Sequence, residues 1–291
     1  MRRLITKVAA CVVAVAALSM APVSAAQHAL PGDRLDEFGS VAPIPHVPPD
    51  GQPKSTPAKG RAGAPPAHRL ADWSAGPNRT IGRLYVTTPA GPDARCVAAT
   101  VPSQFHNLVV TSGHCLSPGG GGAYYTDFRF VPAYQKGRPA PYGEFKGKKP
   151  SVNRAWGRDE DDRNDFGFLT LEPNAEGKQV GSAVGENGFE VNQPVVASRT
   201  VWSYLFDDTP AECFGQTRVY APPPENRLRI DCRYERSSSG GPWLDGYSTS
   251  TQTGFVNGVL SGAPTSNPNV ILSPYFDDGI WDLYKLNANR P

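Results

Sequence analysis

Residues 235–244 read ERSSSGGPWL, and this stretch decides which fold the chain can adopt. One of its serines is a candidate nucleophile, and a serine hydroxyl needs a base within reach because it reacts poorly on its own at neutral pH. Enzymes built on a G-x-S-x-G elbow place their histidine after the serine. Here Ser237 stands where the first glycine of that elbow belongs, and no histidine follows Ser239. The stretch therefore excludes that α/β-hydrolase fold and leaves architectures in which the histidine comes first.

The chain contains five histidines, and all of them precede the serine cluster. Three belong to the N-terminal, proline-rich part of the chain, namely His28, His46 and His68. His106 lies next to Asn107 and two residues after Gln104, ahead of the apolar strand, so we interpret it as a solvent-facing loop residue. His114 follows the apolar residues 108–110 in NLVVTSGHCL, which predicts an imidazole at the end of a strand. His114 is therefore the candidate base.

The candidate orienting acid is Asp165, which opens a strand-like run in NDFGFLTL. A carboxylate held by apolar neighbours keeps a strong hydrogen bond to an imidazole. An aspartate at a strand start is often only a turn or capping residue. The chain order His114, Asp165, Ser239, with each residue in a fitting context, favours a catalytic set over that simpler interpretation.

Beyond Arg79 the chain has the pattern of a β protein. About ten short runs rich in Val, Tyr, Phe, Leu and Thr are separated by turn residues, and no long helical period lies between them. This pattern predicts an all-β barrel or sandwich. Near the C-terminus, Phe276, Ile280 and Leu283 form an i, i+4, i+7 stripe that predicts one closing helix.

The first residues have the layout of a secretory signal. Arg2, Arg3 and Lys7 precede an apolar run and then small residues, which predicts a signal peptide over residues 1–25. Residues 40–79 contain nine prolines and few large apolar side chains, so they bury too little surface to offset their ordering entropy. We interpret residues 26–79 as a largely disordered pro-segment, with a flexible linker as the alternative.

Charge and cysteine content narrow the class of protein further. Without the three basic residues of the signal, 29 − 3 = 26 basic residues face 27 acidic ones, so the net charge is −1. This balance predicts neither a nucleic-acid partner nor a membrane partner after export. Four cysteines remain, which predicts two disulfides, and their three possible connectivities stay open here (Cys96, Cys115, Cys213 and Cys232). A C-x-x-C pattern is missing, so we expect no metal site.

The motifs TSGHC, NDFGFLTL and SSSGGPW resemble the three active-site motifs of the chymotrypsin-like serine peptidases. The set is most similar to the secreted bacterial branch related to glutamyl endopeptidases, over about residues 80 to 291. The resemblance implies two packed antiparallel six-stranded β-barrels, with the site in the cleft between them and a C-terminal helix. The first barrel would span about residues 80–185, the second about 186–275 and the helix about 275–287.

The resemblance also implies a role for each candidate residue. Ser239, directly before Gly-Gly-Pro, would be the nucleophile, His114 its base and Asp165 the orienting acid. The backbone N–H groups of Ser237 and Ser239 would form the oxyanion hole. Three further residues would pair with the substrate backbone, namely Ser261, Gly262 and Ala263. The implied disulfides are Cys96–Cys115 and Cys213–Cys232, each closing a local loop.

Three positions depart from the family's pattern. Ser237 stands where a glycine is usual, so we expect a strained oxyanion loop. Ser238 replaces an aspartate that in many animal relatives pairs with a newly cut N-terminus, so we expect no such ion pair here. Leu260 replaces the histidine of glutamate-specific relatives, so the usual pocket for acidic side chains is missing. Arg233 and Arg236 precede the nucleophile and are candidates for attracting an acidic side chain, or are simply solvated.

The leading interpretation is a secreted bacterial serine endopeptidase, made as a zymogen, that cleaves protein or peptide substrates through an acyl-enzyme. We expect a monomer that needs no cofactor. An impaired homologue that serves as an extracellular binding module is the alternative, because a distorted oxyanion loop would block turnover. Esterase activity without useful peptidase activity is a third possibility.

Overall fold

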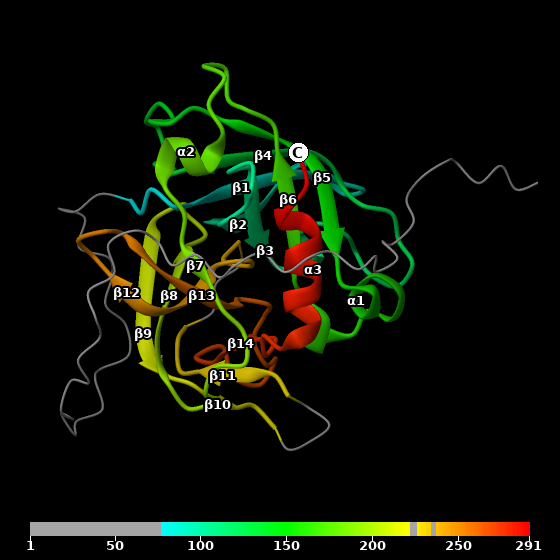
Figure 1. The fold of residues 1–291 in the computed structure, drawn as a ribbon. Coiled ribbons are helices and arrows are strands. Elements are labelled where there is room, and N and C mark those ends of the chain that lie inside the picture. Colours follow the sequence, from blue (N-terminus) through cyan, green and yellow to red (C-terminus); the bar gives the residue numbers. More distant parts are fainter. Residues whose placement is uncertain (1–76, 222–225, 234–236) are drawn as a thin grey trace, which may run out of the picture. The chain divides into compact units, whose positions relative to one another are not determined.

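The computed structural model describes residues 77–221, 226–233 and 237–291 (Figure 1). The predicted signal peptide over residues 1–25 and nearly all of the predicted pro-segment lie outside the described residues, as does Arg236. Within the described residues, no helix combines the length and the hydropathy that a membrane span requires.

The first half of the domain is a closed barrel of six antiparallel strands, which confirms the predicted barrel. The strands follow one another around the barrel in the order β1-β2-β3-β6-β5-β4, and β4 pairs with β1 to close it. Alternate residues of each strand face inward, and buried apolar side chains of all six strands form a cluster. The strands are β1 (Ile81–Thr88), β2 (Gly91–Val101), β3 (Leu108–Thr111), β4 (Thr126–Pro132), β5 (Phe145–Val152) and β6 (Gly167–Leu171).

The second half consists of a five-stranded and a three-stranded sheet. The larger sheet has the order β7-β13-β12-β8-β9, and the smaller has the order β10-β11-β14. The expectation of antiparallel pairing holds except between β7 and β13, which run parallel. The strands are β7 (Gly188–Phe189), β8 (Ser198–Tyr204), β9 (Pro210–Gln216), β10 (Arg218–Val219), β11 (Leu228–Ile230), β12 (Pro242–Ser248), β13 (Thr253–Val259) and β14 (Ile271–Ser273).

A hydrophobic core joins the two halves. It contains buried side chains of the first barrel, such as Phe168, and of the second half, such as Phe189 and Trp202. The predicted C-terminal helix is α3 (Asp278–Ala288), drawn in red in Figure 1, and its predicted stripe contributes Ile280 and Leu283 to this core. The side chain of Asp277 caps α3 by accepting a hydrogen bond from the N–H of Gly279. Two short helices complete the fold, α1 (Arg154–Asp159) and α2 (Val180–Val184).

The two disulfides have the pairing that the family resemblance implied. Cys96 of β2 is joined to Cys115, and Cys213 of β9 is joined to Cys232. Each bridge links residues 19 positions apart in the sequence, a separation for which loop-closure entropy predicts stabilisation of about 3 kcal/mol. The first bridge fixes the residue next to His114, and the second fixes the segment that leads to the serine cluster.

Candidate active site

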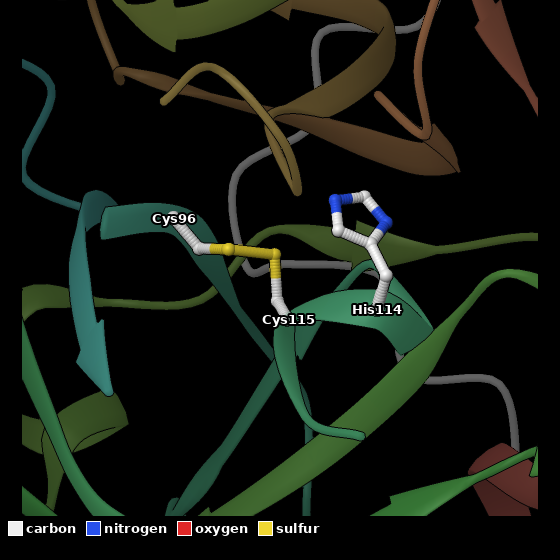
Figure 2. Close-up of side chains that lie close together, drawn as sticks. All are labelled: Cys96, His114 and Cys115. Atoms are coloured by element: carbon white, nitrogen blue, oxygen red, sulfur yellow. A yellow bond between two sulfur atoms is a disulfide. The ribbon is translucent and has the colours of Figure 1, made fainter. Parts of the chain in front are cut away.

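His114 lies just beyond the end of β3, in a short 3-10 helix formed by Gly113–Cys115. The disulfide between Cys115 and Cys96 anchors this turn to β2, and Figure 2 shows the imidazole beside the bridge. Potential ligand atoms of these three residues lie within 4.8 Å of one another. The two sulfurs are bonded to each other and so offer no thiolate to a metal ion. The bridge therefore braces the turn that presents His114.

Asp165 holds His114 by two hydrogen bonds. Its Oδ1 accepts from the backbone N–H of His114 and its Oδ2 lies on Nδ1 of the ring, both at 2.7 Å. The Asp165 side chain is only 2% exposed, whereas that of His114 is 31% exposed. Because a carboxylate only accepts, the ring proton sits on Nδ1 and the lone pair on Nε2. The imidazole is thus presented in the tautomer that a general base requires.

The pKa of His114 lies above its ordinary value. Burial lowers the pKa of the imidazole, but the negative charge of Asp165 and the hydrogen bond to it raise the pKa by more, and Asp162 adds to this effect. The imidazolium that forms when His114 takes a proton is therefore stabilised where it stands.

The carbonyl of Leu260 brings the base and the serine cluster together. Its oxygen accepts from the hydroxyl of Ser112, two residues before His114, at 2.7 Å. It also accepts from the N–H of Gly240, the residue after Ser239, at 2.8 Å. A second link runs through β2, since Val97 donates its N–H to the carbonyl of Ser239 at 2.8 Å. His114 and Ser239 share no direct hydrogen bond within the part of the chain that the structure describes, which is common in a site without substrate.

Gly240 explains why a glycine must follow Ser239. Its φ of +84° belongs to the left-handed region, and a Cβ there would lie 2.1 Å from the carbonyl oxygen of Val97 and 2.2 Å from Oγ1 of Thr111. Only glycine lets the backbone turn this sharply against β2. The turn leaves Ser239 largely buried but without a side-chain partner among the described residues.

Ser237 has the glycine-like backbone that its position led us to expect. Its φ is +73°, and such a conformation costs a residue with a Cβ about 1–2 kcal/mol. Its carbonyl accepts from Nη1 of the buried Arg83 at 2.5 Å. The N–H groups of Ser237 and Ser239 make no hydrogen bond within the described ranges 77–221, 226–233 and 237–291.

Ser238 is a buried residue without charge, as the sequence indicated. Its carbonyl accepts from the hydroxyl of Ser203 on β8 at 2.9 Å. A cavity of about 370 Å³ adjoins Ser238. Arg233 and Leu260 also line this cavity, so the structure brings Arg233 close to the serine cluster.

The predicted substrate-pairing segment runs between β13 and β14. Leu272 fixes it, because the N–H of Ser261 donates to the Leu272 carbonyl at 2.9 Å and the Leu272 N–H donates to the Gly262 carbonyl at 2.8 Å. The N–H of Ala263 and the carbonyl of Ser261 have no hydrogen-bond partner among the residues that the structure describes. The hydroxyl of Ser261 donates to Oδ2 of Asp165 at 2.5 Å. Sequence reasoning missed this last contact, which joins the segment to the acid.

His106, Asp161 and Asp162 each have a charged partner within the protein. His106 is exposed and lies 3.2 Å from Glu186, as expected of a loop residue. Asp161 bonds to Arg163, and Asp162 lies 2.8 Å from Arg227. These two carboxylates therefore already have cationic partners within the protein.

Comparison with known proteins shows that the chain is similar to solved structures of serine proteases. Neither the family models nor the curated proteins give a match. Among solved structures, the thermostable serine protease AL20 from an extremophilic microorganism is 29% identical with a TM-score of 0.67, over 72% of this chain and 97% of that one. The protease Anisep from Arthrobacter nicotinovorans is 30% identical with a TM-score of 0.66, over 73% and 96%. A Glu endopeptidase is 16% identical with a TM-score of 0.58, over 76% and 96%, and shows the fold alone.

The fold and the site define a serine protease architecture of two β halves with the candidate residues between them. The chain belongs to the chymotrypsin-like serine peptidase family.

Proposed function

We propose that the chain is a secreted serine endopeptidase in which Ser239 is the nucleophile, His114 the general base and Asp165 the orienting acid. The observation that carries the proposal is the pair of 2.7 Å contacts from Asp165 to the backbone and ring of His114. These contacts leave Nε2 as the only proton acceptor of the ring. The Leu260 carbonyl accepts hydrogen bonds from Ser112, two residues before His114, and from Gly240, the residue after Ser239.

In the proposed reaction, His114 takes the hydroxyl proton of Ser239 as Oγ attacks the peptide carbonyl. The resulting oxyanion accepts from the N–H groups of Ser237 and Ser239, which have no other partner among the described residues. The imidazolium then gives its proton to the leaving amine, and water hydrolyses the acyl-enzyme by the same route. Asp165 stabilises the imidazolium by charge throughout, which agrees with the raised pKa of His114.

The left-handed backbone of Ser237 favours the enzyme over the binding module. A binding module was expected if a serine at this position left the oxyanion loop malformed. Instead Ser237 has a left-handed φ of +73°, and Arg83 donates a hydrogen bond to its carbonyl. The rest of the fold thus stabilises the strained backbone of Ser237. The N–H groups of Ser237 and Ser239 have no hydrogen-bond partner among the described residues.

Substrates are proposed to be proteins or peptides that lie extended along Ser261, Gly262 and Ala263. The Ala263 N–H and the Ser261 carbonyl, which have no partner among the described residues, are the groups that would pair with the substrate backbone. The cavity beside Ser238 would take the substrate side chain that precedes the cut, with Arg233 in its lining. Cleavage of a peptide mixture, read by mass spectrometry for wild type and Arg233→Ala, would show whether this cation sets the preference.

Export and maturation are proposed from the sequence, with a signal peptide over residues 1–25 and removal of the proline-rich segment. The first described residues are held by hydrogen bonds to side chains of Asn78 and Gln252. Thr80 donates its N–H to Asn78, and Arg79 donates its N–H to the side chain of Gln252 at 3.2 Å. We therefore expect that acetylating the N-terminus of the processed protein leaves activity unchanged. Loss of activity on acetylation would contradict this expectation.

Turnover of peptide and ester substrates tests the proposed function. The processed protein should release product in a burst followed by a steady rate, because an acyl-enzyme accumulates on ester substrates. Ser239→Ala should remove both phases while leaving the fold intact. If the wild type bound peptides without hydrolysing any of them, the protein would be a binding module and the endopeptidase proposal would be wrong.

A further inference from the structure

Arg83 is a charged residue at the centre of the domain. It lies on β1, between the apolar neighbours Gly82 and Leu84, and its side chain is 0% exposed. An unsatisfied buried cation is strongly unfavourable, so its partners indicate what it does in the fold.

The partners of Arg83 come from two segments outside its own barrel. Nη2 lies 2.7 Å from Oδ1 of Asp208 and donates to the carbonyl of Leu205 at 2.8 Å, both in the loop between β8 and β9. Nη1 donates to the carbonyl of Ser237, in the oxyanion loop. The guanidinium also lies over the ring of Tyr204, 4.7 Å from its centroid. A strand of the first barrel is thus joined through one side chain to the loop that precedes the nucleophile.

The loop that contacts Arg83 also has hydrogen bonds of its own. The N–H of Asp208 donates to the Leu205 carbonyl at 3.0 Å, and Leu205 donates to the carbonyl of Thr209 at 2.7 Å. Asp208 is also only 6% exposed and contacts Nη1 of Arg95 through its other oxygen at 3.0 Å. Asp208 and Leu205 both contact Nη2 of Arg83, and its Nη1 is the atom that donates to the carbonyl of Ser237.

Ser237 needs such a contact. A serine leaves the left-handed region unless its surroundings hold it there. Its neighbour Ser238 carries no charge that could pin the loop from within. The Arg83 contact to the Ser237 carbonyl fixes the backbone between the two N–H groups of the proposed oxyanion hole.

We propose that Arg83, oriented by Asp208, is a positioning residue that holds Ser237 in its left-handed conformation and so preassembles the oxyanion hole before substrate binds. The proposal rests on the proposed function for its kinetic consequences. Its structural part concerns the oxyanion loop alone.

Arg199 supplies a matched control. It is also a buried arginine, 1% exposed, and donates to Oγ1 of Thr217 at 2.6 Å and to the carbonyl of Pro194 at 3.0 Å. Its hydrogen-bond partners lie outside the oxyanion loop. Arg83→Met and Arg199→Met should therefore both lower Tm, but only the first should disturb Ser237–Ser239.

The kinetic test compares acylation by p-nitrophenyl acetate in wild type and the two Met variants. Losing one oxyanion donor costs about 100-fold to 1,000-fold in rate, and a donor that is misplaced part of the time should cost about 10-fold to 100-fold. We expect that loss in kcat for Arg83→Met, with KM nearly unchanged and with the acid limb of the pH profile unmoved, because His114 and Asp165 are untouched. Equal kcat losses in the two Met variants would mean that Arg83 is only structural.

Two further variants keep the test decisive if Arg83→Met folds poorly. Arg83→Lys retains the charge for Asp208 but offers no planar fork to reach Ser237 as well, so it should fold and still lose kcat. In the Ser237→Gly background, replacing Arg83 should lower kcat by a smaller factor, because glycine adopts the left-handed conformation without a stabilising contact. An Arg83→Lys variant with wild-type kcat, or an undiminished loss in the Ser237→Gly background, would overturn the proposal.

Hydrogen exchange separates this proposal from the proposed function. In a Ser239→Ala background, the amides of residues 237–241 should exchange faster with Arg83→Met than with Arg199→Met. Faster exchange in a protein whose wild type shows no acylation would support the positioning role and refute the peptidase. Unchanged exchange beside an active wild type would refute the positioning role alone.

Discussion

Replacing Asp165 with Asn should move the ring proton of His114 from Nδ1 to Nε2. The backbone N–H of His114 donates to Oδ1 at 2.7 Å, so the carbonyl oxygen of Asn must take that place. The NH2 group then faces Nδ1 of the ring, which lies 2.7 Å from Oδ2 in the wild type. That group donates to Nδ1, so the ring proton moves to Nε2. No lone pair then faces Ser239.

The expected cost is large because the wrong tautomer removes the base while the binding contacts remain. A change of this kind lowers kcat by about 10⁴-fold, equivalent to about 5.5 kcal/mol of activation free energy. The pKa of His114 should also fall, since burial still lowers the pKa and the charge of Asp165 no longer raises it. In the wild type, His114 loses its neutral, basic form as the pH falls through its pKa, which lies above the ordinary value for histidine. The acid limb of kcat/KM in Asp165→Asn should therefore lie at lower pH.

The assay is the pH profile of kcat/KM for wild type, Asp165→Asn and Asp162→Asn. Asp162 raises the pKa of His114 by its charge only and pairs with Arg227, so it is the matched control. Its Asn variant should shift the acid limb slightly downward and keep kcat within about threefold. An Asp165→Asn enzyme within tenfold of wild type, or an acid limb that moves to higher pH, would refute the reasoning.

Three other changes have distinct expected outcomes. Gly240→Ala should destabilise the fold by more than about 3 kcal/mol, because its Cβ would lie 2.1 Å from the Val97 carbonyl, and a Tm within a few degrees of wild type would contradict this. Replacing Cys115 and Cys96 by Ala should cost about 3 kcal/mol in thermal unfolding and lower turnover, and unchanged melting and turnover would count against it. Burial, with the charge of Asp245 second, raises the pKa of Glu190 to about 7, so the folded state loses stability as pH rises toward that value. Glu190→Gln should then raise the free energy of unfolding at pH 8 by about 1 kcal/mol, after allowance for partial exposure, and leave it unchanged at pH 4. An equal gain at both pH values would show that charge is not the cause.

The parts of the fold that the sequence predicted are those whose apolar residues recur at a regular period. β3 and β6 are fully buried runs of valine, leucine and phenylalanine, and the stripe of α3 lies in the core. β5 lacks such a pattern, because it carries three lysines and is buried mainly at its ends. β12 begins with a proline just after the nucleophile and contains Asp245 and Gly246, which interrupt the alternation of a strand. These two segments form strands because they pair with neighbouring strands, although their sequences lack a regular apolar pattern.

The candidate site followed from the sequence where local context was enough. The positions of His114 and Asp165 came from strand ends, and the strain at Ser237 from a missing glycine. The contacts of Ser261 with Asp165 and of Arg83 with Ser237 span 96 and 154 residues, so no local pattern reports them. A single arginine inside the apolar run GRLYVTT was the only trace of the second contact in the sequence. Such long-range contacts depend on how the two halves pack.

Labelling by a fluorophosphonate probe tests the central claim, the activation of Ser239, most directly. The processed protein would be treated with the probe, and the modified residue located by mass spectrometry, beside Ser239→Ala and His114→Ala. We predict rapid labelling at Ser239 that both substitutions abolish. Labelling of wild type no faster than of the two variants would contradict the account and leave the binding module as the function of this fold.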